Sequence, residues 1–355
     1  MSAPLPALPS RDARPWFPGR QAVSLPLDTA PRLHVVVDTE EEFDWYAPFD
    51  RRNTGVTAMA AIDGFQELCD EVGLSPTYVI DYPIASQPAG YAALARYAAE
   101  GRATIGAHLH AWVSPPFDED LVGPANQRHS FQGNLPRALE RDKLARLTEV
   151  IERNLGVRCT VHKAGRYGFG PNTASILAEL GYTTDCSISA GFDWSALEGP
   201  DFQHFTSAAF TFGRGLLELP ASGGFVGWTP LGLRRALYRL AARPSLSALR
   251  LKGVSARLGL AERILLSPEG YTFEDLARFA RAPLAQGERL LTLTLHSPSL
   301  VPGHTPYVRT AADRDTLLRV LRRFFEFFLG ELGGRPTTPA EAHSLLRPST
   351  LHASP

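Results

Sequence analysis

Acidic and histidine side chains follow several predicted strands at the point where each strand ends. Glu40 and Glu41 come directly after a β-branched apolar run, His108 and His110 end a second run, and His296 ends a third. In parallel α/β folds the active site forms at the carboxyl ends of the strands. We therefore expect these side chains, which are far apart in the sequence, to meet around one pocket.

Residues of these types could carry out metal-assisted hydrolysis. Two close carboxylates push their pKa values apart, so that one acts as a base while the other stays anionic. A carboxylate with two neutral imidazoles binds a divalent metal and leaves positions open for water. Such a metal lowers the pKa of bound water and polarises a carbonyl group. A separate histidine, His296, would then protonate the leaving group.

The elements that must position these residues alternate between short strands and helices. Apolar, β-branched runs predict seven strands, at 32–38, 76–81, 103–108, 160–165, 182–189, 215–221 and 288–296. Helical periodicity, often between a Pro and a Gly, predicts helices at 57–73, 91–101, 136–156, 171–181, 273–287 and 315–332. This alternation is typical of a mainly parallel sheet with helices outside, either a barrel or a doubly wound sheet.

Composition excludes several classes of protein. The chain has 355 residues with 36 Lys+Arg against 37 Asp+Glu, so no net field attracts nucleic acid. The three cysteines are far apart, which excludes a disulfide scaffold and a zinc ribbon. No apolar run is long enough to span a membrane, and the first residues lack the apolar stretch of a signal peptide, so we expect a cytoplasmic protein.

One large domain accounts for most of the chain. We expect a loose N-terminal arm or strap over 1–30, a barrel domain over 31–335 and a C-terminal tail over 336–355. The segment 229–266 interrupts the alternation and has seven Arg and one Lys against one acid, Glu262. It is interpreted either as an inserted amphipathic helical pair or as a lid that holds an anionic saccharide.

Four stretches in order carry a resemblance to a known family. VVVDTEEEFDW, IGAHLHAW, KAGRYGFG and LTLHSPSL resemble the successive motifs of the polysaccharide deacetylase superfamily (NodB homology, carbohydrate esterase family 4-like), in particular a bacterial subgroup associated with surface polysaccharides. The resemblance implies an α/β fold, a distorted (β/α)7 barrel. It also implies hydrolysis of non-peptide carbon–nitrogen bonds, typically the deacetylation of N-acetylated sugars.

The resemblance assigns roles to residues of this chain. It implies that Glu40 is the general base, that Arg166 orients this base and that His296 is the general acid. The metal ligands would be Glu41, His108 and His110. The residues expected to contact the substrate are Trp112, Tyr167, Asp193 and Leu295.

One departure from the family pattern keeps alternatives open. Trp112 occupies the position of the second metal histidine, four residues after His108, so His110 would have to replace that ligand. A divalent metal, zinc or similar, is therefore one prediction. A metal-independent amidohydrolase of the allantoinase-like type and a non-catalytic carbohydrate-binding barrel are the others. The expected partner is a saccharide or small amide, which the Arg-rich segment would allow to be anionic.

Overall fold

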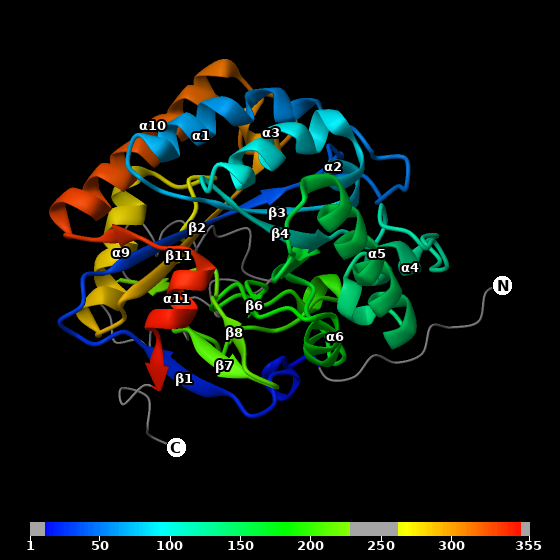
Figure 1. The fold of residues 1–355 in the computed structure, drawn as a ribbon, viewed down its shortest axis with the longest axis horizontal. Coiled ribbons are helices and arrows are strands. Elements are labelled where there is room, and N and C mark those ends of the chain that lie inside the picture. The colour runs from blue at the N-terminus through cyan, green and yellow to red at the C-terminus, as the bar shows by residue number, and fades with distance from the viewer. Residues whose placement is uncertain (1–10, 228–261, 349–355) are drawn as a thin grey trace, which may run out of the picture.

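Seven parallel strands form the centre of the computed structural model, which describes residues 11–227 and 262–348. Their spatial order is β11, β2, β3, β4, β5, β6 and β8. The bounds are Arg32–Thr39 (β2), Thr77–Ile80 (β3), Thr104–Leu109 (β4), Val161–Ala164 (β5), Thr184–Asp185 (β6), Leu216–Glu218 (β8) and Leu290–His296 (β11). The sheet curls with helices outside it (Figure 1), which confirms the expected distorted barrel.

Helices cover the outer face of the curled sheet (Figure 1). They are Ile62–Asp70 (α1), Tyr82–Ser86 (α2), Pro88–Ala99 (α3), Pro124–His129 (α4), Arg137–Leu155 (α5), Thr173–Leu180 (α6), Phe273–Ala285 (α9), Ala311–Glu326 (α10) and Pro339–Leu345 (α11). Local sequence sets their ends. Thr272 and Thr310 begin α9 and α10 with capping boxes, and α5 ends at Gly156, whose φ of 69° favours glycine.

The alternation of side chains along β11 separates the barrel interior from the helix-facing core. Leu291, Leu293 and Leu295 pack in the larger apolar cluster with the helices. The residues between them point the other way, because successive side chains of a strand face opposite sides. Thr294 and His296 therefore face the interior, where both line the main pocket.

The barrel is not closed by a continuous strand pair between β8 and β11. The chain after β8 is instead joined to β11 through single hydrogen bonds: Ser222 N donates to Thr292 O at 2.9 Å, Leu266 N to Ser222 O at 2.7 Å and Thr294 N to Leu266 O at 3.0 Å. We call these contacts the seam. The antiparallel pair of β9 (Gly223–Val226) and β10 (Glu262–Leu265) lies beside it.

The described part of the N-terminal segment is packed, so the loose arm predicted for 1–30 is wrong for residues 11–24. β1 (Gln21–Ser24) pairs with β7 (Phe210–Phe212) and with β13 (Arg347–Pro348), extending the sheet. Phe17 is buried and stacks on Phe169 with ring centroids 4.5 Å apart. The burial of aromatic area holds this segment in place although its sequence lacks helical or strand periodicity.

The C-terminal segment is also built into the fold. β12 (Arg335–Pro336) pairs with β2, α11 follows, and β13 then pairs with β1. The segment predicted as an insertion at 229–266 lies outside the described residues except for 262–266, where Glu262–Leu265 is the strand β10.

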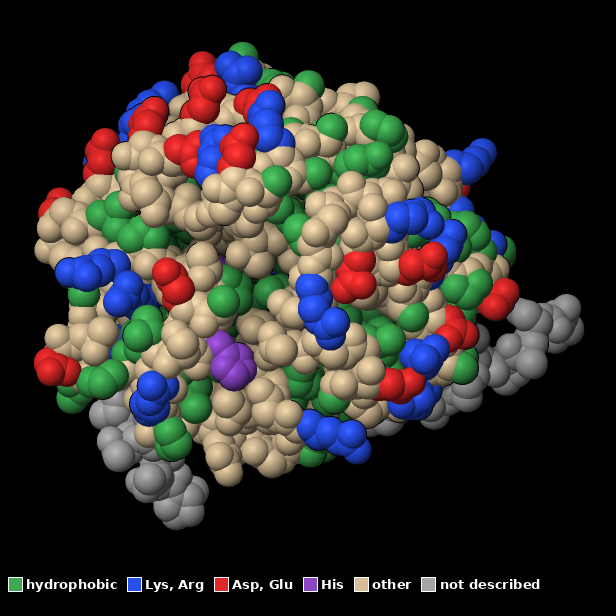
Figure 2. All heavy atoms as spheres, viewed as in Figure 1, with side chains coloured by type: hydrophobic (Ala, Val, Ile, Leu, Met, Phe, Trp, Pro, Cys, Tyr) green, Lys and Arg blue, Asp and Glu red, His purple; other side chains and the backbone are tan. Residues whose placement is uncertain are grey.

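Acidic and basic side chains alternate over the outer helices on the face shown in Figure 2. Many of them form exposed ion pairs, such as Arg141 with Glu179 and Arg322 with Glu71. This mixing agrees with the balanced composition. Within the described residues, none of the helices combines the length and apolarity that a membrane crossing requires.

Candidate active site

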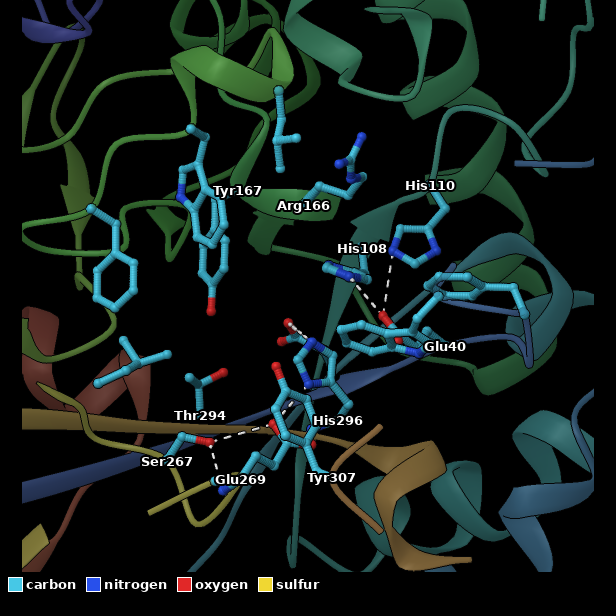
Figure 3. A pocket seen from close by; sticks show the side chains of 18 of the residues that line it. Glu40, His108, His110, Arg166, Tyr167, Ser267, Glu269, Thr294, His296 and Tyr307 are labelled. Atoms are coloured by element: carbon cyan, nitrogen blue, oxygen red, sulfur yellow. Dashed lines mark hydrogen bonds and ion pairs between the residues drawn. The ribbon is translucent and has the colours of Figure 1, made fainter. Parts of the chain in front are cut away.

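One cavity of about 560 Å³ lies at the carboxyl ends of the parallel strands, as predicted. Five side chains with catalytic chemistry line it: Asp38, Glu40, His108, His110 and His296. Its other walls are largely aromatic, with Phe43, Trp45, Phe49, Phe131, Tyr167, Phe192, Trp194, Tyr271 and Tyr307. The volume is that of a small-molecule site. Figure 3 shows the catalytic-type side chains gathered on one side of the cavity.

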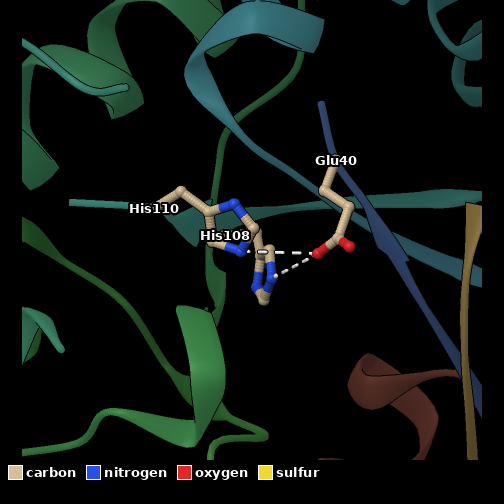
Figure 4. Close-up of side chains that lie close together, drawn as sticks. All are labelled: Glu40, His108 and His110. Atoms are coloured by element: carbon tan, nitrogen blue, oxygen red, sulfur yellow. Dashed lines mark ion pairs between the residues drawn. The ribbon is translucent and has the colours of Figure 1, made fainter. Parts of the chain in front are cut away.

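Glu40, His108 and His110 point toward one another (Figure 4). Glu40 Oε2 lies 3.5 Å from His108 Nε2 and 3.4 Å from His110 Nε2. Burial lowers the pKa of His108, and it lowers the pKa of His110 to about 4. Both imidazoles are therefore neutral at pH 7, the form in which histidine binds metals.

The remaining ring nitrogens are held by the protein. His108 Nδ1 lies 3.0 Å from the carbonyl oxygen of Lys163, and His110 Nδ1 lies 2.7 Å from Glu41 Oε2. Such contacts fix the tautomer that presents Nε2 to a ligand. Gly165 allows the close packing, because a Cβ there would lie 2.4 Å from His110 Cδ2.

Glu41 lies at the ring nitrogen of His110 that faces away from Glu40. Its Oε1 accepts a hydrogen bond of 2.7 Å from Trp112 Nε1, and its backbone N–H donates to Asp81 Oδ2 at 2.6 Å. Burial raises the pKa of the Glu41 carboxyl to about 8. Two groups of possible ligand atoms converge among the described residues: Glu40 with His108 and His110, and Glu41 with Asp81 and His110. The first of these groups lines the cavity, and the second lies behind it. The set predicted from the sequence had Glu41 in place of Glu40.

Asp38 and Lys163 form a buried ion pair in the floor of the cavity. Lys163 Nζ lies 2.6 and 2.7 Å from the two Asp38 carboxylate oxygens and 2.8 Å from Thr294 Oγ1. Burial alone would raise the pKa of Asp38, but the charge of Lys163, with His108 and His296, outweighs it and lowers this pKa. Asp38 is therefore ionised in the neutral range.

His296 lies directly beside Asp38 in the register of β11 and β2. Its Nε2 is 3.7 Å from Asp38 Oδ2, and its Nδ1 is 2.8 Å from Glu269 Oε2. Burial disfavours the imidazolium, yet Glu269 and Glu40 outweigh this and raise the pKa of His296 to about 10. The structure thus holds a protonated histidine at the cavity wall.

Arg166 lies in the cavity wall, but its contacts differ from those expected of a residue that orients a base. Its Nη1 donates to Ser130 Oγ, and the guanidinium lies over the rings of Phe49 and Phe131. Lys163, three residues earlier, makes the contact with an active-site carboxylate. Arg166 and Tyr167 follow β5 in consecutive left-handed conformations with φ of 55° and 59°.

Of the four residues predicted to contact the substrate, one lines the cavity and three do not. Tyr167 lines the cavity. Trp112 is fully buried and supports Glu41 from behind, outside the cavity lining. Leu295 packs against the helices, because the alternation along β11 that turns His296 inward turns Leu295 outward. Asp193 lies in an exposed turn, where it accepts hydrogen bonds from Ser195 N and Gln203 Nε2, both at 2.9 Å.

Three functional side chains received no role in the sequence analysis: Asp38, Lys163 and Glu269. The first two carried a signal. Asp38 ends a strand in the same register as His296, and Lys163 is one of only three lysines in a chain with 36 basic residues. Glu269 carried none, because it reaches His296 from a loop after β10.

No protein-family model and no curated protein matches the chain. Solved structures that resemble it include a protein from Mycobacterium smegmatis assigned as a polysaccharide deacetylase (TM-score 0.49, 16% identity, 91% of this chain and 93% of that one). Another is a 4-alpha-glucanotransferase from Thermococcus litoralis (TM-score 0.48, 12% identity, 89% of this chain and 40% of that one). A third is the catalytic domain of a peptidoglycan N-acetylglucosamine deacetylase from Eubacterium rectale (TM-score 0.37, 9% identity, 89% of this chain and 93% of that one). These alignments extend over about nine-tenths of the chain.

Proposed function

We propose that the protein hydrolyses the amide bond of an N-acylated sugar with the help of a divalent metal ion. The observation that carries the proposal is the convergence of Glu40, His108 and His110 beside the ionised Asp38 and the protonated His296. These are the parts that hydrolysis of an amide requires: a metal site, a base and an acid.

The three converging residues fit a metal ion. Ligand atoms about 2.1 Å from a tetrahedral ion lie ~3.4 Å apart, and the Glu40 oxygen lies 3.5 and 3.4 Å from the two histidine nitrogens. Glu40 Oε1 is buried without a hydrogen-bond partner, so this oxygen is available to bind a metal ion. A zinc-like ion at these residues would polarise the amide carbonyl and lower the pKa of a bound water.

Asp38 is the base of this proposal, while Glu40 serves as a metal ligand. Lys163 keeps the Asp38 carboxylate ionised and fixes both of its oxygens. The carboxylate lines the same cavity as Glu40, so it can accept a proton from a water that attacks the carbonyl carbon. This differs from the roles implied by the sequence resemblance, in which Glu40 was the base and Glu41 the metal ligand.

His296 is the acid. Glu269 holds its Nδ1, which leaves Nε2 facing the cavity beside Asp38. After attack of water on the carbonyl, transfer of the Nε2 proton to the amide nitrogen allows the C–N bond to break and the amine to leave. The rings of Trp45 and His296 contact each other nearly at right angles, with centroids 5.1 Å apart.

The aromatic wall of the cavity supports a sugar as substrate. Tyr167, Trp194 and Phe192 form a row of nearly parallel rings, with neighbouring centroids 5.7 Å apart. The apolar faces of a pyranose ring pack well on such a surface. Together with the resemblance of the four motifs, this row favours a saccharide over a small amide.

The proposal is tested by acetate release from N-acetylglucosamine oligomers, combined with elemental analysis of the purified protein. We expect hydrolysis that chelation abolishes and zinc restores, with about one ion per chain. Full activity after chelation would support the metal-independent amidohydrolase. Binding of the oligomers without hydrolysis at any metal load would support the non-catalytic barrel.

A further inference from the structure

Arg166 is a feature of the cavity that amide hydrolysis does not use. Its guanidinium is largely buried, and burial is the one cause that lowers its pKa, to about 10. Within residues 11–227 and 262–348, none of the carboxylates forms an ion pair with it, and its one polar side-chain partner is Ser130. The sequence outside those ranges contains neither Asp nor Glu, so it offers no side-chain carboxylate to Arg166.

The two fully buried lysines of the described chain have acidic partners. Lys163 pairs with Asp38, and Lys143 pairs with Glu119 at 2.8 Å. A buried cation without a counter-charge is costly, so proteins rarely keep one without a function. Arg166 has no such partner among the described residues, and it lies in the wall of the cavity.

The chain holds this guanidinium in one place. Phe49 and Phe131 lie 4.6 and 4.1 Å from it, on cation–π contacts that partly offset its desolvation. The backbone of Arg166 is left-handed, with φ of 55°, a conformation that costs a non-glycine residue about 1–2 kcal/mol. Strain and aromatic packing thus fix a positive charge near His110 (Figure 3).

We infer that Arg166 binds an anionic oxygen group of the substrate, a carboxylate or a phosphate, so that the substrate is an N-acylated sugar with an acidic substituent. That the bound anion belongs to a substrate rests on the proposed function, whereas the anion site itself does not. Planar guanidinium groups match carboxylate and phosphate oxygens in bidentate contacts. Since Arg166 lies near His110, the acidic group is carried close to the amide that reacts.

The test compares three probes that share the N-acetylglucosamine unit: N-acetylglucosamine itself, N-acetylmuramic acid and N-acetylglucosamine 6-phosphate. Calorimetry on the zinc-loaded protein measures their affinities, and acetate release measures kcat/KM. We expect at least one acidic probe to bind ~10-fold or more tightly than the neutral one, the range of a charge-assisted contact. A gain in affinity for N-acetylmuramic acid indicates a carboxylate site, and a gain for N-acetylglucosamine 6-phosphate indicates a phosphate site.

The variants are Arg166→Met, which removes the charge, and Arg166→Lys, which keeps a charge but not the planar fork. We expect Arg166→Met to lose the preference for acidic probes and Arg166→Lys to retain part of it. Arg141→Met, which removes an exposed guanidinium of α5 outside the cavity, is the matched control and should keep the preference. Thermal melts establish that each variant is folded.

Two results would overturn the inference. Equal affinity of the wild-type protein for neutral and acidic probes would show that Arg166 has no anion to bind. A loss in Arg166→Met that is the same for all three probes would assign the residue to the reaction or to the fold. Anion binding through Arg166 without any acetate release would instead refute the proposed hydrolysis and leave the anion site standing.

Discussion

Lys163 Nζ contacts both carboxylate oxygens of Asp38, at 2.6 and 2.7 Å, and both side chains are buried. If Asp38 is the base, Asp38→Asn should lower kcat ~10²–10⁴-fold, the contribution typical of general base catalysis. The variant should still bind metal, because Asp38 is outside the group of converging ligands. Acetate release and elemental analysis of the same preparation check both statements, and a fully active Asp38→Asn protein would remove Asp38 from the mechanism.

The same ion pair should matter for stability. Lys163→Met leaves a buried carboxylate without its partner, so we expect the free energy of unfolding to fall by about 3–5 kcal/mol. In the double variant Asp38→Leu, Lys163→Met both charges are absent, and most of that loss should be recovered while activity stays lost. Urea unfolding of the four proteins in this cycle measures the coupling, and additive losses would contradict it.

Metal content should separate Glu40 from Glu41. Glu40→Ala, His108→Ala and His110→Ala should each reduce bound zinc far below one per chain. Glu41→Gln should lower the affinity ~10–100-fold without abolishing binding, because Glu41 acts on His110 from behind. Asp44→Asn, in the exposed part of the same acidic run, is the control and should bind like the wild type. Full zinc affinity in Glu40→Ala would refute its role as a ligand.

The pH profile should depend on Glu269. The pKa of His296 is raised to about 10, so this acid stays protonated through the neutral range and loses its proton only at alkaline pH. Glu269→Gln removes the largest favourable charge on the imidazolium, so the alkaline limb of kcat/KM should move to lower pH. An unchanged limb in the variant would show that His296 is not the group that titrates there.

Acid sensitivity of the fold should include a contribution from His34. Its ring is buried, with Nε2 2.9 Å from Thr77 Oγ1, and burial lowers its pKa to about 3 from an ordinary 6.5. The unfolded chain therefore binds a proton that the folded chain excludes, and stability present above pH 6.5 is lost as the pH falls toward 3. Between pH 7.5 and 4.5 this amounts to ~2–3 kcal/mol.

The variant His34→Gln isolates that contribution. Its free energy of unfolding should fall less than that of the wild type between these two pH values, in denaturant titrations at each. His343→Gln, at an exposed position on α11, should fall as the wild type does. Parallel losses in wild type and His34→Gln would show that other groups account for the acid sensitivity.

Much of the fold could be predicted from the sequence because periodicity and end signals agree. The strand at 288–296 and the helix at 136–156 match β11 and α5 closely. The strand predicted at 182–189 shrinks to Thr184–Asp185, and the pairing resumes as a single bridge between Ser189 and Ala221. Between them, Ser187 Oγ donates to Asp185 Oδ1 at 2.7 Å, a local hydrogen bond that competes with strand pairing.

The site was predictable as a location but not as a set of roles. Strand ends indicated that Glu40, His108 and His296 would meet, and all three line the cavity. Which of two adjacent glutamates turns inward depends on how the chain leaves β2, and periodicity does not extend into that turn. Leu295 is different, because the alternation that points His296 inward already requires its neighbour to face the helices.

The cavity wall is built from two kinds of element, strands of the parallel sheet and the loop that follows the seam beside β11. Glu40, His108 and Lys163 stand on or directly after strands locked into the parallel ladder, whereas Glu269 is carried by a loop attached through single bonds at Ser222 and Leu266. Loops of low local stability yield first when a structure opens. A protein engineer could therefore remodel the loop around Glu269 to admit new substrates while leaving Glu40, His108 and His110 in place.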